Sequence, residues 1–195
     1  MFSTETLTHP KVIQLLKSGG VGVIPTDTVY GLVCRAADQD AVKKLYALKH
    51  RKLKPGTVIA ANIDQLANLG IKKRYLKAVE QYWPGAISIE IPHSVAYLHQ
   101  GTGRQAFRIP NDAEVISLLE QVGPLQTTSA NHPDAPTATT LTEAEEYFGN
   151  LVDFYVDGGN MDSRPPSTII RIVDDAIEII REGAVKINEN GRIEK

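Results

Sequence analysis

Residues 21–51 constrain the fold of this chain more than any other stretch. Their sequence, VGVIPTDTVYGLVCRAADQDAVKKLYALKHR, predicts a buried strand, a polar elbow, a helix and a final group of cations. Residues 21–24 are an apolar, largely β-branched run that Pro25 stops, as expected of an interior strand. Asp38 is a candidate N-cap, and apolar residues follow it at helical spacing. Because ligands of open α/β sheets bind where strands end, the elbow after residue 24 marks a candidate site.

The elbow and the far end of the predicted helix carry groups that suit an anion. Residues 26–28 (TDT) offer two hydroxyls and a carboxylate, and the helix delivers Lys49 and Arg51. Residues two apart point to different faces of a helix, so both cations reach one anion only if the helix ends near Lys49. The Pro-Gly pair at residues 55–56 fits such an end. Hydroxyls facing a lysine and an arginine predict a phosphate-binding site.

Apolar runs and helical patterns are interleaved along the rest of the chain. We expect strands at residues 57–61, 86–91, 105–109, 124–128, 152–156, 167–173 and 176–180, the last two forming a hairpin. We expect helices that begin near residue 10, at 64–69, at 72–82, after residues 111–112, and from a capping box of Thr142 and Glu145 to Gly149. Without repeats or a low-complexity linker, this order predicts one α/β domain over residues 1–195 with a mixed sheet.

The composition excludes several classes of protein. A net charge of −2 argues against a chain that coats nucleic acid, although a local basic patch is compatible with it. Cys34 is the only cysteine, and the five histidines lack ligand spacing, so we expect no disulfide framework and no metal held by the protein. Neither a signal pattern nor an apolar run of membrane-spanning length occurs, which predicts a cytoplasmic protein without membrane contact.

Short motifs occur in a defined order along the chain. They are PTDTVYGL (25–32), LKHR (48–51), WPG (83–85), FRIP (107–110), TSAN (128–131), DGG (157–159), STII (167–170) and IIREGA (179–184). Together they resemble the YrdC-like family of L-threonylcarbamoyl-adenylate synthases, in its short single-domain form, over residues 10–186. The combination of Lys-x-Arg and Ser-x-Asn after Pro-Thr-x-x-Val-Tyr-Gly is the specific part of this resemblance.

The resemblance implies a fold, a reaction and partners. The fold is an open twisted α/β sheet with a concave, positively lined ligand face. The reaction condenses L-threonine, bicarbonate and ATP into L-threonylcarbamoyl-adenylate and pyrophosphate, for threonylcarbamoylation of the adenosine next to the anticodon of certain tRNAs. The implied partners are tRNA and a downstream threonylcarbamoyl-transferase complex. Mg²⁺ is expected to accompany ATP, but the sequence identifies no protein ligand for it.

The resemblance also implies roles for single residues. Its ATP-binding positions are Lys49, Arg51, Thr127, Ser129, Asn131, Thr137 and Arg181. Within that set, the expected catalytic residues are Lys49, Arg51, Ser129 and Asn131, because phosphoryl chemistry needs mainly positioning and charge neutralisation. Its threonine-binding positions are Thr28, Arg108 and Ser167, with Arg108 as the partner of the amino-acid carboxylate.

Each assignment has an ordinary structural alternative. Lys49 at a helix end is often simply solvated, Arg108 could lie on the surface of a strand, and Ser129 could only shape a turn. Asp27 invites a general-base role, but a turn-stabilising carboxylate is the simpler interpretation. Tyr30 is expected to lie partly in the core and partly in the pocket wall.

The chain also departs from the family pattern, chiefly in loops. Lys52, Ala86, His132 and Glu182 stand where the motifs usually carry other residues, which bears on loop shape and substrate affinity. Two alternative functions remain. One is a non-catalytic paralogue of the same fold that binds RNA or nucleotide, and the other is a carbamoyl-adenylate activity on a different acceptor.

Overall fold

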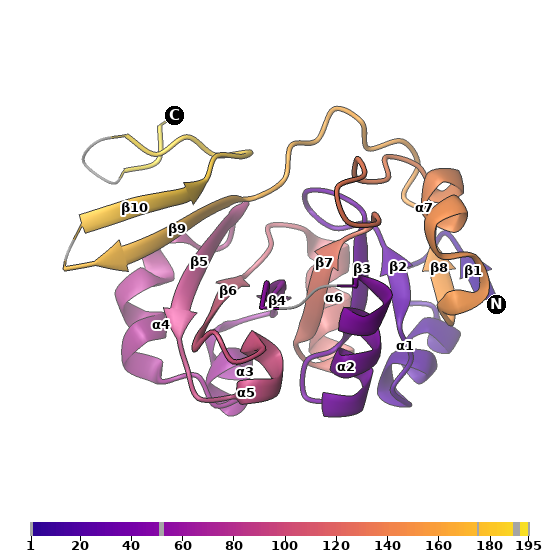
Figure 1. The fold of residues 1–195 in the computed structure, drawn as a ribbon, viewed down its shortest axis with the longest axis horizontal. Helices are drawn as coiled ribbons and strands as arrows, with labels where there is room; N and C mark the ends of the chain where they lie inside the picture. Colours follow the sequence, from indigo (N-terminus) through magenta and orange to yellow (C-terminus); the bar gives the residue numbers. More distant parts are fainter. Residues whose placement is uncertain (1, 51–52, 175, 189–191, 195) are drawn as a thin grey trace.

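The computed structural model describes residues 2–50, 53–174, 176–188 and 192–194 (Figure 1). Within this part of the chain, ten strands form one mixed sheet in the order β1-β8-β2-β3-β7-β4-β6-β5-β9-β10. The strands are β1 (Phe2–Thr4), β2 (Gly22–Ile24), β3 (Gly31–Arg35), β4 (Thr57–Ile59), β5 (Ile87–Pro92), β6 (Arg104–Arg108), β7 (Leu125–Ser129), β8 (Phe154–Val156), β9 (Thr168–Val173) and β10 (Ala176–Arg181). The predicted α/β class, with an open mixed sheet, is confirmed.

Helices cover both sides of the central strands. They are α1 (Pro10–Lys17), α2 (Gln39–Leu48), α3 (Ile63–Asn68), α4 (Lys73–Val79), α5 (Ala96–His99), α6 (Ala113–Val122) and α7 (Leu141–Phe148), with 3₁₀ turns η1 (Glu80–Tyr82) and η2 (Gly149–Leu151). As predicted, Asp38 and Asp112 cap α2 and α6 by accepting hydrogen bonds from backbone N–H groups of the first turn. None of the described helices is both long and apolar enough to cross a membrane.

The core consists of two apolar clusters, which lie on opposite faces of the sheet. In β3, Leu32 and Cys34 pack in the cluster that includes residues of α2, whereas Val33 packs in the cluster that includes α1 and α6. Successive side chains of a strand point to opposite faces, so a strand covered on both sides is a continuous apolar run. This double burial holds the centre of the sheet rigid beneath the candidate site.

The neighbouring strands β5, β6 and β9 are covered on one face only. Ile89 and Phe107 lie in the apolar core, while Ser88, Glu90 and Arg108 point to the opposite face. Alternation along the expected strand at residues 105–109 predicts that Arg108 lies on the face opposite Phe107, and this is confirmed. The uncovered face is therefore polar by alternation, and a pocket opens on it.

The main correction concerns the segment after the elbow. The sequence suggested that a helix follows directly, but residues 31–35 form β3, which pairs antiparallel with both β2 and β7. The elbow is thus the connection of a β2–β3 hairpin. Pairing with β7 depends on residues almost a hundred positions away, which a local pattern does not contain. Strand β1 and the short helix α5 were also not predicted.

The start of α7 is a second correction. Thr140, rather than Thr142, is the N-cap, and its hydroxyl accepts a hydrogen bond from the Glu143 N–H at 3.3 Å. The Glu143 carboxylate in turn accepts from the Thr139 N–H at 2.7 Å. The expected kind of cap is present two residues earlier, because threonines at 139, 140 and 142 offer competing starts.

Two predictions that bear on the site are confirmed. Helix α2 ends at Leu48 with Lys49 as its C-cap, so the basic segment leaves the helix where the phosphate hypothesis required. Strands β9 and β10 form the expected antiparallel hairpin, which Figure 1 shows at one end of the sheet. Arg51 and Lys52 lie outside the described residues.

Candidate functional site

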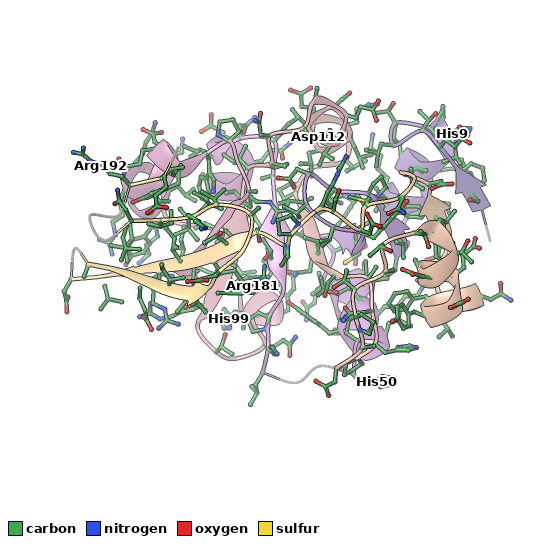
Figure 2. All side chains as sticks on the ribbon, turned by 90° about the horizontal axis from the view of Figure 1, so that it is seen from above. His9, His50, His99, Asp112, Arg181 and Arg192 are labelled. Atoms are coloured by element: carbon green, nitrogen blue, oxygen red, sulfur yellow. The ribbon has the colours of Figure 1, made fainter. Side chains whose placement is uncertain are left out.

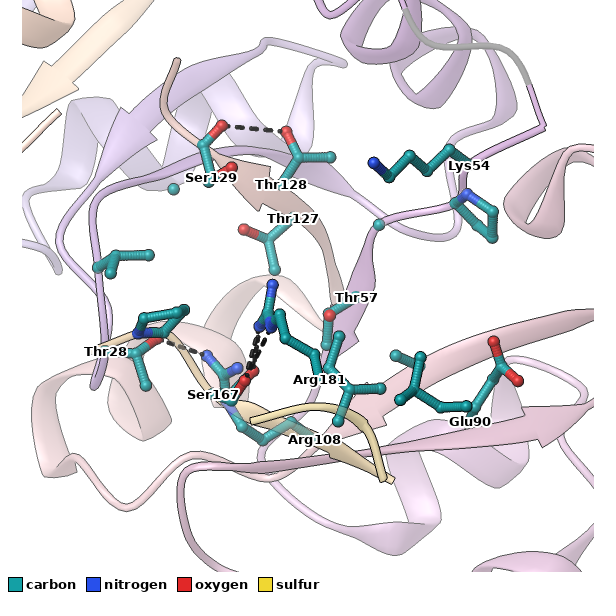
Figure 3. Close-up of a pocket in the computed structure, with 18 of the residues that line it drawn as sticks. Thr28, Lys54, Thr57, Glu90, Arg108, Thr127, Thr128, Ser129, Ser167 and Arg181 are labelled. Atoms are coloured by element: carbon teal, nitrogen blue, oxygen red, sulfur yellow. Dashed lines mark hydrogen bonds between the residues drawn. The ribbon is translucent and has the colours of Figure 1, made fainter. Parts of the chain in front are cut away.

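A pocket of about 590 Å³ opens on the uncovered face of the sheet (Figure 3). Its wall combines residues from the elbow, from the start of β4, from β5, β6 and β7, and from the β9–β10 hairpin. Of the residues predicted from the sequence, it is lined by Thr28, Arg108, Thr127, Ser129, Ser167 and Arg181. The tertiary structure therefore brings residues predicted to bind the amino acid and residues predicted to bind the nucleotide to one pocket.

Arg108 is the centre of the polar network on the amino-acid side. Its Nη2 donates to Asp27 Oδ1 at 2.8 Å and to Thr28 Oγ1 at 3.4 Å, and its Nη1 donates to Ser88 Oγ at 3.3 Å. The hydroxyls of Ser88 and Ser167 are hydrogen-bonded at 2.9 Å. The three predicted threonine-binding side chains thus share one network at the end of β6.

Asp27 and Arg108 form a buried ion pair. Their side chains are only 6% and 4% exposed, and separating such a pair by removing one partner typically costs about 3–5 kcal/mol. Burial raises the pKa of the Asp27 carboxyl above 3.8, although the Arg108 charge lowers it. Asp27 Oδ2 and Arg108 Nε are buried without a hydrogen-bond partner among the described residues.

The turn itself is held by a different residue. Thr26 Oγ1 accepts hydrogen bonds from the N–H groups of Thr28 and Val29, both at 3.2 Å, and donates to the Val29 carbonyl oxygen at 2.7 Å. This is the local hydrogen bonding by which hydroxyl side chains stabilise turns. The turn-stabilising role that the sequence suggested for Asp27 therefore belongs to Thr26. The Asp27 carboxylate instead pairs with Arg108.

Arg181 enters the pocket from the other side. Its Nε and Nη2 donate to the Ser167 carbonyl oxygen at 3.2 and 2.7 Å, and Nη2 also donates to Ser167 Oγ at 3.2 Å. Figure 2 shows Arg181 toward the middle of the molecule, whereas His9 and Arg192 lie at its periphery. The bonds to Ser167 place a guanidinium next to the Arg108 network, as Figure 3 shows.

Lys49 lies beneath the pocket rather than in it. Its side chain is 1% exposed, and Nζ donates to the Ser129 carbonyl oxygen at 2.8 Å, to Asn131 Oδ1 at 2.7 Å and to the Asn131 carbonyl oxygen. Ser129 Oγ also donates to Asn131 Oδ1 at 2.7 Å, and Asn131 Nδ2 donates to the Ala135 carbonyl oxygen. The lysine of Lys-x-Arg therefore contacts the Ser-x-Asn motif, and Ser129 lines the pocket.

Comparison with known proteins agrees with this geometry. The Sua5/YciO/YrdC family model, described as telomere recombination, matches residues 14–183. The chain belongs to this family. A relative named threonylcarbamoyl-AMP synthase, from Pseudomonas aeruginosa, is 35% identical over 166 residues, which cover 82% of this chain and 90% of the relative. Its relatives thus place the chain among nucleotidyltransferase-type enzymes.

Two solved structures of the Sua5/YciO/YrdC family share the fold. Sua5 of P. abyssi, complexed with L-threonine, superposes with a TM-score of 0.81 at 24% identity, over 94% of this chain and 57% of that chain. YciO of E. coli superposes with a TM-score of 0.77 at 22% identity, over 93% and 94% of the two chains. The present chain therefore spans little more than half of the Sua5 chain and nearly all of YciO.

Besides Lys49, two predicted residues within the described part of the chain do not line the pocket. Asn131 contacts Lys49 and Ser129 but does not line the pocket, and Thr137 is half-buried and also outside its lining. Arg51 belongs to the residues that the structure does not describe. Asn131 and Thr137 follow the turn that presents Ser129.

Tyr30 corrects another expectation. The side chain is fully buried, and its hydroxyl donates to Asp157 Oδ1 and the Gly159 carbonyl oxygen while accepting from the Gly158 N–H. Burial raises the pKa of the Tyr30 hydroxyl to about 12. Tyr30 is thus not part of the pocket wall but ties the elbow to the Asp-Gly-Gly turn.

Sequence reasoning missed several residues that line or support the pocket. Ser88 and Glu90 lie on β5, Arg104 lies on β6, and Arg171 lies on β9. Ser88 and Glu90 are two residues apart, and Arg104 lies four residues before Arg108, so each pair shares the face opposite the apolar core. This spacing is the signal that could have identified Ser88, Glu90 and Arg104. The sequence also shows Asp27 at the elbow, but it contains no local signal for the pairing of Asp27 with Arg108.

The described residues hold no group of three or more His, Cys, Asp or Glu side chains that could bind a metal ion. Glu90, which lines the pocket, is paired with Arg171. A divalent cation in this pocket would therefore depend on phosphate oxygens for most of its ligands, as Mg²⁺ commonly does with nucleotides.

Proposed function

We propose that this chain condenses L-threonine, bicarbonate and ATP into L-threonylcarbamoyl-adenylate and pyrophosphate, for threonylcarbamoylation of the adenosine next to the tRNA anticodon. The observation that carries the proposal is the convergence of Thr28, Arg108 and Ser167 with Ser129 and Arg181 around one pocket. The names of the curated relatives support it.

The amino acid binds at the end of β6. Its carboxylate pairs with Arg108, whose guanidinium is already oriented by Asp27, Thr28 and Ser88. The hydroxyl groups of Thr28 and Ser167 line the same part of the pocket and suit the polar atoms of threonine. Because these groups are ordered before binding, little conformational entropy is lost when the amino acid enters.

The nucleotide binds against β7 and the hairpin. Ser129 and Thr127 offer hydroxyls to phosphate or ribose oxygens, and Arg181 supplies a guanidinium. Lys49 and Asn131 hold the turn that presents Ser129, with Arg51 and Thr137 completing the proposed ATP-binding set. The surplus of cations in the pocket lining supports a positively lined ligand face: these are Lys54, Arg104, Arg108, Arg171 and Arg181, against Glu90.

The reaction needs positioning more than a covalent nucleophile. The amine of threonine attacks the carbon of bicarbonate, and water leaves to give a carbamate. An oxygen of this carbamate then forms a bond to the α-phosphorus of ATP. The bond from that phosphorus to the bridging oxygen breaks, and the electron pair leaves with pyrophosphate. Arg181 and the groups around Ser129 stabilise the charge on the phosphates, while Arg108 holds the acceptor in line. Mg²⁺ would enter with the nucleotide and neutralise phosphate charge.

Pyrophosphate release tests the proposal directly. Purified protein is supplied with ATP, bicarbonate and Mg²⁺, with and without L-threonine, beside Ser129→Ala, Arg108→Ala and the control Lys43→Ala on the exposed face of α2. We expect threonine-dependent release that Ser129→Ala and Arg108→Ala reduce at least about tenfold and that Lys43→Ala leaves unchanged.

Other outcomes identify the alternatives. Pyrophosphate release that does not depend on threonine would support the nucleotide site but indicate a different acceptor. Folded protein that releases no pyrophosphate, yet binds tRNA with strong salt dependence, would replace the catalytic proposal with an RNA-binding paralogue. As part of the same proposal, the reaction takes place in the cytoplasm, and a threonylcarbamoyl-transferase complex takes its product.

A further inference from the structure

The positive charge of Arg108 is paired with the carboxylate of Asp27 before any ligand enters the pocket. Asp27 Oδ1 lies 2.8 Å from Arg108 Nη2, and both side chains are more than nine-tenths buried. Asp27 itself does not line the pocket, whereas Arg108 does. An incoming ligand therefore meets an arginine that lines the pocket on one side and is paired with a buried carboxylate on the other.

This arrangement distinguishes ligands by charge distribution. A simple carboxylate gains most from an unpaired cation, and a neighbouring negative charge offsets much of that attraction. An amino-acid zwitterion carries an ammonium group as well, which is attracted by the same negative charge. Coulombic attraction acts across several ångströms in a buried site, so direct contact with Asp27 is not required.

We propose that Asp27 is a positioning residue that sets the specificity of this site: it holds the Arg108 guanidinium and supplies the negative charge by which the pocket selects an amino-acid zwitterion over a carboxylate of the same shape without the amine. The inference rests on the proposed function and names a determinant of its substrate class.

Other residues account for the roles that Asp27 or a different carboxylate could have at this site. Thr26 holds the turn, so Asp27 is not needed for it. Glu90, a carboxylate in the pocket lining, is paired with Arg171. Asp112 repels the Asp27 carboxylate, but its own carboxylate caps α6. Among the described residues, Asp27 is thus the carboxylate that forms an ion pair with Arg108.

Binding of two matched ligands tests the proposal. One is L-threonine, and the other is (R)-3-hydroxybutyrate, which keeps the carboxylate and the hydroxyl but lacks the amine. Calorimetry measures both on wild-type protein, on Asp27→Asn, and on the control Asp157→Asn. Asn keeps the size of Asp27 and an oxygen that can accept from Arg108. Asp157 accepts a hydrogen bond from the Tyr30 hydroxyl on the other side of the elbow, and among the described residues no hydrogen bond or ion pair joins it to Arg108.

We expect the wild-type protein to prefer L-threonine strongly. In Asp27→Asn the preference falls at least about tenfold, because threonine binds more weakly while (R)-3-hydroxybutyrate binds as well or better. Asp157→Asn keeps the wild-type preference, and ATP affinity changes less than about twofold in both variants. A merely structural role of Asp27 would lower the affinity for all three ligands together and leave their ratio unchanged.

An unchanged ratio in folded Asp27→Asn would overturn the proposal, as would a uniform loss of all three affinities. Asp27→Ser makes the same charge change with a smaller side chain and serves if the Asn variant does not fold. Suppose that wild-type protein releases pyrophosphate in a threonine-dependent way, but that Asp27→Asn keeps the wild-type ratio of affinities for L-threonine and (R)-3-hydroxybutyrate. That result would refute only this inference. The absence of such release from folded wild-type protein would refute the proposed function.

Discussion

The ammonium group of Lys49 lies 2.8 Å from the carbonyl oxygen of Ser129, beneath the turn that carries Ser129 to the pocket. The same group binds the Asn131 side chain, so one buried cation gathers oxygen atoms from both ends of the Ser-x-Asn motif. A turn with converging carbonyl oxygens is electrostatically unfavourable unless a donor satisfies them. Lys49 therefore shapes the nucleotide side of the site through Ser129.

Replacing Lys49 by Met is expected to lower both stability and activity. It leaves the Ser129 carbonyl and Asn131 Oδ1 without their donor, which costs on the order of 2 kcal/mol, or about 4–8 °C in Tm for a chain of this size. Thermal unfolding and pyrophosphate release measure the two effects. Lys54→Met, at an exposed position of the pocket rim, should leave Tm unchanged. A Lys49→Met protein with wild-type Tm and activity would contradict this role.

Replacing Gly56 by Ala is expected to disturb the pocket at the start of β4. A Cβ atom there would lie 2.2 Å from the Thr127 carbonyl oxygen, so the β4 and β7 backbones would have to separate. We expect a loss of about 1–3 kcal/mol, measured by urea unfolding, with weaker ATP binding. Gly85→Ala, whose Cβ would lie 3.6 Å from the nearest atom, is the matched control and should be nearly neutral. Equal stability of the two variants would refute the steric explanation.

His93 is expected to make stability depend on pH in the acidic range. Burial, together with repulsion from His99, lowers its pKa from 6.5 to about 4. The unfolded chain binds more protons between these values, so this contribution to stability is complete above pH 6.5 and is lost as pH falls toward about 4. Urea unfolding of wild-type protein and His93→Gln at several pH values measures it. The difference in the free energy of unfolding between wild-type protein and His93→Gln should shrink on acidification. Plots of that free energy against pH that stay parallel would show that His93 does not contribute.

Asp27 is expected to act in the opposite direction. Its pKa in the folded protein lies above 3.8, because burial outweighs the attraction of Arg108. The folded state then binds more protons than the unfolded chain from pH 3.8 up to the raised pKa, so the Asp27 contribution to stability falls as pH rises through that window. The stability of wild-type protein relative to Asp27→Asn should decline over this range. A relative stability that instead increases with pH would mean that Arg108 outweighs burial.

Local sequence signals predicted the elements that depend on neighbouring residues. The end of α2 at Leu48 and its cap at Asp38 were correct, because a helix boundary depends on side chains within one turn of it. The position of Arg108 opposite Phe107 was also correct, since alternation is a property of any strand. The motifs that indicated the family are likewise short runs of sequence, and the match over residues 14–183 agrees with them.

The contacts that make the site could not be obtained in this way. Strand β3 forms because β2 and β7 lie on either side of it, and Ser88 meets Ser167 because β5 and β9 are neighbours although the residues are 79 positions apart. Which strands become neighbours depends on how all the apolar faces are buried together. Asp27 was therefore visible as a polar residue at a turn, but its pairing with Arg108 follows from the order of strands in the sheet, to which distant segments contribute jointly.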